Sequence, residues 1–274
     1  MKKAILLWVL AVLVTLGSAY YQRKTGPTYP VNGSVTFEGQ KISYYFFRSH
    51  EGADNHTVSI DIPDTTINGS LVYVRFKSYE NTVEVPLVRK GATLSAQFPG
   101  QQAAGKIQYY VKLNRGLSFV NVPESPVILR FKGPVPMWVL LPHVLIMFLA
   151  MLYSTKAGLS ALFNLKNIKS ETIITLILLI IGGMVFGPLL QKYAFDSYWT
   201  GVPFGFDLTD NKTLIGLIVW IFAFIAIRKQ KSVKAWVLAA SITLLVVFLI
   251  PHSILGSEVD YTKTPAKIEA PVNK

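Results

Sequence analysis

The sequence has no cysteine and few charged side chains, and both absences exclude whole classes of protein. Without cysteine the chain cannot form a disulfide framework, a thiolate zinc site, an iron–sulfur cluster or a covalent c-type haem link. Charged residues make up 15% of the 274 residues, well below the roughly 25% typical of soluble domains. The 51% hydrophobic content and the lack of long like-charge runs argue against a disordered tail protein. A wholly soluble protein is therefore not expected.

Long apolar stretches are what the sequence does contain. Crossing about 30 Å of hydrocarbon takes about 20 apolar residues in a helix. Away from their ends, the stretches hold one ionisable group, His143, and Lys234 stands at the start of the last stretch. This pattern predicts a multi-pass α-helical membrane protein with five spans, at residues 4–21, 135–153, 172–190, 214–227 and 233–255.

Basic residues collect in alternate connecting segments, which predicts the orientation. Lys and Arg in short loops stay on the cytoplasmic side. The loop at 191–213 carries more acids than bases, and it falls on the opposite side together with the tail. We therefore expect a bacterial inner-membrane protein with a cytoplasmic N-terminus and an exported C-terminus. The net charge of +12 then reflects mainly topology, so nucleic acid is not expected as a partner. The basic residues are Lys2, Lys3, Lys156, Lys166, Lys169, Arg228, Lys229, Lys231 and Lys234.

The first apolar stretch has two interpretations. Two lysines, a short apolar core and the small residues at 17–19 are typical of a cleavable signal peptide. Tyr20 and Tyr21, followed by Arg23 and Lys24, are typical of an interfacial anchor on a retained helix. Either interpretation exports the segment that follows.

Residues 28–133 have a different pattern, with alternating Val, Ile, Tyr, Phe and Thr and frequent turn residues. Asn32-Gly33, Asn68-Gly69 and Lys90-Gly91 supply the positive-φ residues that hairpins need. Seven or eight short strands in a domain of this length predict an exported, periplasmic antiparallel β-sandwich. The candidate strands are residues 33–37, 41–48, 56–62, 70–77, 82–89, 93–98, 105–113 and 127–131.

The end of this segment resembles the last strands of an immunoglobulin-like or fibronectin type III domain. The resemblance is carried by residues 104–111 and 126–131, where Tyr109 or Tyr110 is similar to the buried corner tyrosine of that fold. The segment has neither the buried cysteine pair nor a tryptophan. The resemblance therefore implies a fold and no ligand.

The predicted organisation is an N-terminal anchor or signal peptide at 1–27, the β-sandwich at 28–133, a four-helix transmembrane bundle at 134–255 and an exported tail at 256–274. Gly183 and Gly187 form a GxxxG sequence, which lets two helix backbones approach closely.

Two histidines, His143 and His252, follow prolines and fall on the same side of the predicted bundle. An ionisable residue inside a membrane span is by default a candidate functional residue. The pair has the chemistry to ligate haem b, or copper or zinc together with a carboxylate. A structural role, in which each imidazole hydrogen-bonds a carbonyl freed by the neighbouring proline, is favoured over ligation, and a proton or quinol contact is the remaining alternative.

The loop at 191–213 is rich in aromatics, glycine and acids. Its aromatics fit an interfacial belt, Asp210 or Asn211 fits the N-cap of the fourth span, and the whole loop fits a lid over a pocket. A divalent cation is the sharper hypothesis, although the spacing is not that of an EF-hand. The candidate oxygen ligands are Asp207, Asp210, Asn211, Glu258 and Asp260.

A second polar loop, at residues 48–56, contains His50, Glu51, Asp54 and His56. Two imidazoles and two carboxylates so close together have the chemistry of a copper or zinc site. Gly, Asp and Asn in the same loop are also typical of a solvated turn.

No GxSxG, HExxH or phosphate-binding loop occurs, so no catalytic residue is assigned. The sequence favours a non-enzymatic inner-membrane subunit or scaffold whose β-sandwich binds a protein partner or a second copy of the chain. The alternatives are a membrane redox or metal protein using His143 and His252, and a transporter. Transport is disfavoured because ion-coupled transport usually needs buried acids and bases.

Overall fold

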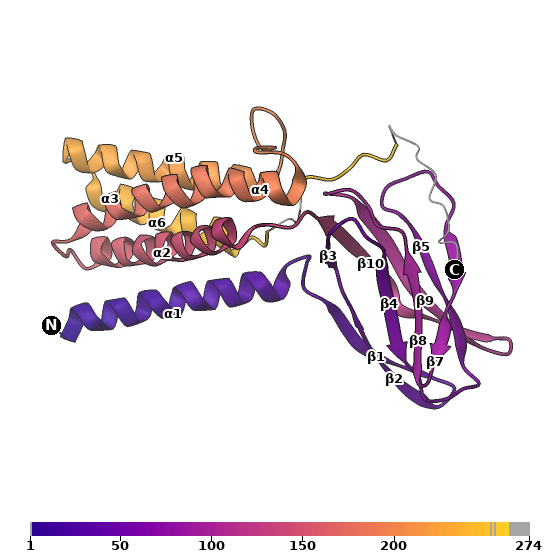
Figure 1. Ribbon diagram of the computed structural model, residues 1–274. Coiled ribbons are helices and arrows are strands. Elements are labelled where there is room, and N and C mark those ends of the chain that lie inside the picture. The colour runs from indigo at the N-terminus through magenta and orange to yellow at the C-terminus, as the bar shows by residue number, and fades with distance from the viewer. Residues whose placement is uncertain (1, 253, 255, 263–274) are drawn as a thin grey trace. The chain divides into compact units, whose positions relative to one another are not determined.

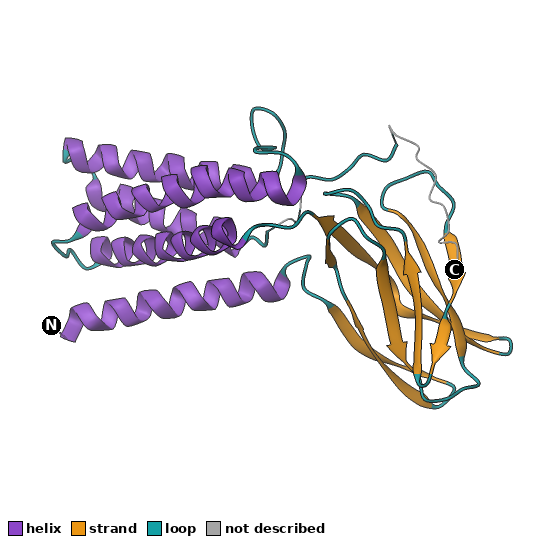
Figure 2. Ribbon diagram, viewed as in Figure 1, coloured by secondary structure: helices purple, strands orange, loops and turns teal. Residues whose placement is uncertain are grey.

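The computed structural model describes residues 2–252, 254 and 256–262 and divides the chain into two compact units. The helical unit comprises Met1–Pro27 and Val135–Ser257, and the β unit comprises Thr28–Pro134 and Glu258–Lys274. Figure 2 shows that helices and strands do not mix within either unit. The protein is thus a mixed α and β molecule.

The helical unit contains four apolar segments that are long enough to cross a membrane. The third of them is continuous through α3, η1 and α4, and together these run from Ile168 to Phe195. The last helix has 17 residues, or about 25 Å, which is short of a typical hydrocarbon core. The elements are α1 (Lys2–Thr25), α2 (Met137–Leu162), α3 (Ile168–Leu178), η1 (Leu179–Phe186), α4 (Gly187–Phe195), α5 (Leu208–Lys229) and α6 (Val233–Leu249).

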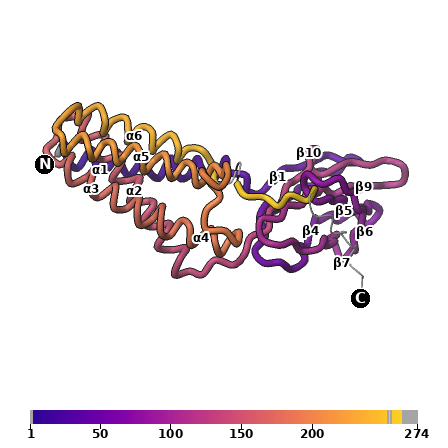
Figure 3. Tube along the Cα trace, turned by 90° about the horizontal axis from the view of Figure 1, so that it is seen from above, coloured from indigo at the N-terminus to yellow at the C-terminus, as the bar shows by residue number. Residues whose placement is uncertain are grey.

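Small side chains fill the centre of the helical unit. Because alanine, serine and glycine let helix backbones approach closely, they suit helix packing in lipid. Large apolar side chains such as Leu145 and Ile218 stay exposed. Figure 3 shows α5 and α6 running alongside each other, and a Cβ added at Gly216 of α5 would lie 2.7 Å from Leu244 of α6. The buried small residues include Ala150, Ser154, Ala157, Ala161, Ala223 and Ala240.

Helix α1 lies against α2 and α6 through one narrow face. Leu7, Ala11, Thr15 and Ser18 are buried at intervals of three or four residues, as expected for one stripe of a helix. At its end, the Gln22 side-chain amide donates to the carbonyl of Phe248, with a nitrogen–oxygen distance of 2.5 Å. The first apolar stretch is therefore packed as part of the bundle.

The glycines of the predicted GxxxG sequence lie at a π-helical segment, η1. A Cβ added at Gly183 would lie 2.6 Å from Thr213 Cγ2 of α5, and one at Gly182 would lie 2.8 Å from Ile146 Cγ2 of α2. A Cβ at Gly187 would make only ordinary contacts. The close approach is thus made by Gly182 and Gly183, one turn earlier than the second glycine of the sequence motif.

The β unit contains ten strands in three sheets (Figure 1). The five-stranded sheet has the order β3-β10-β9-β5-β6, the three-stranded sheet β4-β8-β7, and β1 and β2 form a separate hairpin. All pairings are antiparallel except that of β3 with β10. The strands are β1 (Val31–Phe37), β2 (Gln40–Phe46), β3 (Ser49–Glu51), β4 (His56–Asp61), β5 (Asn68–Arg75), β6 (Val83–Pro86), β7 (Val88–Lys90), β8 (Thr93–Phe98), β9 (Lys106–Arg115) and β10 (Ser118–Lys132).

One apolar core joins the three sheets, and it is built from large side chains. In β9, every second residue from Ile107 to Leu113 is buried, as the two-residue period of a strand requires. Tyr109 lies within this core, and its hydroxyl donates to the carbonyl of Phe47 over 2.8 Å. Burial raises the pKa of this phenol, partly opposed by the nearby charge of Arg48.

Most strands lie within two residues of the predicted ranges, but β3 lies in the predicted polar loop at 48–56, and the turns predicted at Asn32-Gly33 and Asn68-Gly69 lie inside β1 and β5. β8 matches the expected residues 93–98, whereas the expected strand at 82–89 is divided into β6 and β7. β10 begins at Ser118 instead of 127. It pairs with β9 on both sides of a register shift between Val122 and Val127, and the sequence pattern predicted only the part after this shift. Pro123 and Pro126 lie in that irregular part, where a strand tolerates missing N–H donors.

Candidate functional site

The residues predicted to form a site in the helical unit lie where the aromatic loop (residues 196–207) joins α5. The N-cap of α5 is Asp207, not Asp210 or Asn211, because the helix begins at Leu208. Asp207 Oδ1 accepts from the amide of Thr209 over 2.8 Å, and Oδ2 accepts from the amide of Ser257 over 2.7 Å. Burial raises the pKa of Asp207, but these hydrogen bonds outweigh it and the net pKa is below the ordinary value.

Asp210 and Asn211 hold the aromatic loop onto the first turn of α5. Asp210 Oδ2 accepts from the backbone amides of Thr200 and Gly201, over 2.6 and 2.9 Å, and Asn211 Oδ1 accepts from the amide of Val202 over 2.8 Å. A side chain at Gly201 would collide with Asp210, whose Cβ lies 2.6 Å from the position of an added Cβ. These oxygens are therefore engaged by N–H donors, which a bound cation would have to displace.

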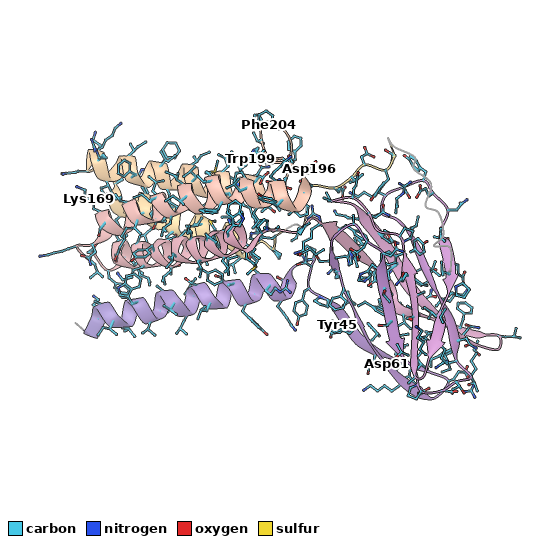
Figure 4. The ribbon with its side chains drawn as sticks, viewed as in Figure 1. Tyr45, Asp61, Lys169, Asp196, Trp199 and Phe204 are labelled. Atoms are coloured by element: carbon cyan, nitrogen blue, oxygen red, sulfur yellow. The ribbon has the colours of Figure 1, made fainter. Side chains whose placement is uncertain are left out.

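The loop's aromatic side chains point outward. Phe204 is 82% exposed and Phe206 88% exposed, and Figure 4 shows Phe204 at the far end of the loop and Asp196 at its base. Trp199 donates from its indole N–H to the carbonyl of Val202 over 3.1 Å. The loop is thus an ordered projection with apolar side chains at its tip, which fits the interpretation as an interfacial belt better than that of a lid.

The other two predicted oxygen ligands belong to the β unit. Glu258 accepts from Lys77 and Lys106, over 2.5 and 2.7 Å, and Asp260 Oδ1 accepts from the amide of Thr262 over 3.0 Å. Burial raises the pKa of Glu258, and the two lysines bring it below the ordinary value. Within residues 2–252, 254 and 256–262, no three His, Asp or Glu side chains gather around a possible metal position. The five-residue cation hypothesis gains no support from this arrangement.

His143 of α2 is positioned by the π-helical segment. Its Nδ1 lies 3.0 Å from the carbonyl oxygen of Gly182, so Nδ1 carries the proton and Nε2 has the free lone pair. His252, which follows α6, is exposed and lies close enough to His143, Lys212 and Asp207 for their charges to act on it. The structure therefore brings the two predicted histidines to the same end of the helical unit.

Lys212 lies beside this pair and was not singled out by the sequence. It is 5% exposed, and its Nζ donates to the carbonyl of Ile250 over 2.7 Å. Together with Gln22, it satisfies carbonyls at the C-terminal end of α6, where a cation also suits the helix dipole. This hydrogen bond explains how a buried lysine is tolerated near the start of α5.

A buried charge pair lies elsewhere in the helical unit, and the expectation of no buried acid or base besides His143 is wrong. Lys156 and Glu171 are 2% and 5% exposed in their side chains, and Nζ to Oε1 is 2.7 Å. Lys156 also donates to Ser160 Oγ over 2.8 Å, and its Nζ lies 5.3 Å from the Trp8 ring centroid.

The sequence pattern assigned Lys156 to a loop, but α2 continues to Leu162. No local sequence signal pairs Lys156 with Glu171, because the two residues lie on different helices that are brought together by packing. The buried pair also removes the main reason for disfavouring transport.

Comparisons of the chain with protein-family models, with curated proteins and with solved structures each return no match.

Proposed function

We propose that the protein is a non-enzymatic membrane subunit or scaffold that presents its β unit to a protein partner. The observation that carries this proposal is the tip of the β9–β10 hairpin. Leu117 is fully exposed and Phe119 is 65% exposed, next to the positive-φ turn at Gly116. Burying a large apolar side chain contributes roughly 1.5–3 kcal/mol, so such a tip favours association with another surface.

The tip is held far from the point where β10 leads into the helical unit. β10 has 15 residues, and at about 3.3 Å per residue its ends are separated by on the order of 45 Å. Lys132 lies at one end of this strand and Ser118 at the other. The hairpin is thus suited to reaching a second protein while the chain's other end stays anchored.

The β unit is proposed to be an immunoglobulin-like sandwich in a bacterial periplasm. Two features support this fold: the two larger sheets share one core, and β3 pairs in parallel with the last strand, β10. The helical unit is proposed to cross the inner membrane five times, with α6 as the fifth span and a cytoplasmic N-terminus. The basic residues near both ends of the α5–α6 connection, Arg228, Lys229, Lys231 and Lys234, support this orientation.

The test is blue-native electrophoresis of detergent extracts from the cells that make the protein. The double variant Leu117→Asp/Phe119→Asp should run as the free protein, while the wild type runs as a larger complex. Tyr79→Asp is the matched control, since Tyr79 is 91% exposed on the same unit but outside this hairpin. Co-purification of two differently tagged copies separates self-association from a different partner. Identical migration of the wild type and the double variant would reject the proposal.

The second candidate function is redox or metal chemistry at His143 and His252, through haem b or a metal ion. The specific support is the hydrogen bond from His143 Nδ1 to Gly182, because metal-binding histidines usually donate their other ring N–H to a carbonyl or carboxylate. His143 would then offer Nε2 to the iron or metal. A visible spectrum of purified protein, oxidised and dithionite-reduced, with elemental analysis, tests this. A Soret band or stoichiometric metal that is lost in His143→Gln supports it; a colourless, metal-free protein from cofactor-replete cells rejects it.

A further inference from the structure

Two histidines of the β unit meet at the edges of two different sheets. His50 lies in β3, at the edge of the five-stranded sheet, and His56 begins β4, at the edge of the three-stranded sheet. Their Nδ1 atoms are 3.1 Å apart, and their ring centroids are 5.0 Å apart. The connecting loop brings Asp54 to the far side of the first ring, with Oδ1 3.2 Å from His50 Nε2.

The hydrogen bond to Asp54 determines which ring nitrogen of His50 has a free lone pair. When His50 donates its Nε2 proton to Asp54, its Nδ1 is an acceptor directed at His56. A neutral His56 can carry its own proton on Nδ1, or move it to Nε2 and free Nδ1 as well.

The separation of the two nitrogens suits chelation of one metal ion. Two imidazole nitrogens at about 2.05 Å from an ion are about 2.9 Å apart in square-planar and about 3.3 Å apart in tetrahedral geometry. The observed 3.1 Å falls between these values. We propose that His50 Nδ1 and His56 Nδ1 chelate a divalent transition-metal ion of the class that prefers imidazole, such as Cu²⁺ or Zn²⁺.

Aromatic packing holds both ligands in place before any ion arrives. The His50 ring lies 5.2 Å from the Phe131 ring, and the His56 ring lies 5.3 Å from the Phe98 ring. Since both phenylalanines are fully buried, the two imidazoles rest on the core of the unit. Little conformational entropy is then lost when the ion binds.

The loop between the histidines is equally constrained. The amide of Gly52 donates to the carbonyl of Lys132 over 2.9 Å, and Asn55 Oδ1 accepts from the amide of Gly100 over 3.2 Å. Gly100 packs so closely on this loop that an added Cβ would lie 1.8 Å from the carbonyl oxygen of Ala53. The loop therefore acts as a fixed support for the two ring nitrogens.

Asp54 takes the role that a carboxylate has behind a metal-binding histidine, since it accepts the proton of the nitrogen that does not face the ion. Glu51 does not contribute, because its carboxylate is paired with Lys132 over 2.9 Å. The ion would therefore have two nitrogen ligands from the protein, with water in the remaining positions. Bound there, it would also cross-link the edges of the two sheets.

The experiment uses full-length protein in detergent, carrying no polyhistidine tag and with His143→Gln and His252→Gln so that no other histidine is present. Cu²⁺ is titrated and followed by electron paramagnetic resonance. We expect one equivalent to bind with hyperfine structure from two nitrogens. His50→Gln and His56→Gln should each weaken binding at least tenfold, Asp54→Asn should weaken it about 10- to 100-fold, and Glu51→Gln should have no effect.

Thermal unfolding gives an independent readout. Added Cu²⁺ should raise the unfolding temperature of the β unit when both histidines are present, and should not do so in His50→Gln. His50 decides the outcome if His56→Gln fails to fold, because the His50 side chain is partly exposed. No stoichiometric binding to the protein that retains both histidines, or binding unchanged in His50→Gln, would overturn the proposal and leave a simple hydrogen bond between the rings.

Discussion

The two units bury opposite kinds of side chain. The β unit buries large ones, including Phe46, Tyr73, Phe98 and Tyr109, and leaves polar residues outside. The helical unit buries many alanines, serines and threonines together with a few large side chains such as Trp220, and it exposes many large apolar residues, including Leu141 and Ile225. In water, such an exposed apolar surface would be a liability, whereas in lipid it has no such cost. The exposed apolar surface of the helical unit is compatible with insertion in a membrane.

The units also differ in how they bury charge. In the β unit the buried Arg75 is matched by Glu80 at the edge of the core, within a few residues of sequence. In the helical unit Lys156 and Glu171 join two different helices, and both are almost fully buried. The free energy of a charge buried between helices, in a surrounding of low dielectric constant, depends strongly on whether an opposite charge is paired with it. The helical unit should therefore be the more sensitive of the two to the loss of one charged group.

The largest effect is expected from breaking this buried pair. Glu171→Leu leaves the Lys156 ammonium buried beside an apolar side chain, which should destabilise the folded protein by about 3–5 kcal/mol. Unfolding by SDS in mixed micelles measures the change.

The double variant Lys156→Met/Glu171→Leu is the matched control. Replacing both charges with apolar groups should recover most of the lost stability, because a buried ion pair is often no more stabilising than good apolar packing. A double variant as unstable as Glu171→Leu would mean that the site needs its charges, as a proton or ion pathway would.

The core of the β unit gives the next effect. Phe98→Ala removes a fully buried ring that contacts His56, Tyr73, Tyr109 and Phe131, and should cost about 3–5 kcal/mol. Leu145→Ala in α2 should cost well under 1 kcal/mol in detergent, since Leu145 is 61% exposed. Thermal unfolding of both variants, followed by near-ultraviolet circular dichroism, compares them. Equal losses of stability in the two variants would contradict the contrast between large side chains buried in the β unit and large side chains exposed in the helical unit.

The sequence pattern predicted apolar helices and β-strands, because apolar runs and two-residue alternation report directly on which residues are apolar on one face. It did not predict the polar pairs. Lys156 and Glu171 are far apart in any local pattern, and only the packing of α2 against α3 brings them together. The N-cap was misplaced for a similar reason, because Asp207, Asp210 and Asn211 all suit a helix start, and the partners from the loop and Ser257 decide among them. The meeting of His50 with His56 likewise depends on the pairing of β3 with β10.

Adding side-chain volume where two helices touch should destabilise the helical unit, because small residues make these contacts. A Cβ at Gly158 of α2 would lie 2.6 Å from Ser241 Cβ of α6, so Gly158→Ala should destabilise by roughly 1–3 kcal/mol. Gly158→Ala/Ser241→Gly should recover stability, because removing the Ser241 side chain makes room for the added methyl group. The SDS midpoint of both variants tests the contact, and a double variant no better than the single one would contradict it.

In the β unit, a pH dependence should follow from His56. Its pKa is lowered by burial to about 4, while an unfolded histidine titrates near 6.5, so the unfolded chain binds the extra proton between these values. Stability should therefore fall on acidification from about pH 6.5 to 4, by at most about 1.4 kcal/mol per pH unit. His56→Gln should flatten this part of the profile, measured by thermal unfolding with EDTA present. An unchanged slope would show that His56 is not held neutral.

The smallest effect concerns the aromatic loop, where the helical unit relies on hydrogen bonds rather than on packing. Asp207→Ala removes the N-cap of α5 and the acceptor for Ser257, and should cost about 1 kcal/mol and speed hydrogen exchange in residues 196–207. Because hydrogen bonds hold the pKa of Asp207 below its ordinary value, its contribution is present above about pH 3.9 and is lost as the pH falls through the lowered pKa. Asp196→Asn, at an exposed carboxylate paired with Lys192, should leave the loop unchanged, because asparagine tolerates the left-handed backbone conformation of this residue. Similar hydrogen exchange in both variants would mean that the loop is ordered by something other than its buried carboxylates. Hydrogen bonds would then not distinguish this end of the helical unit from the apolar core of the β unit.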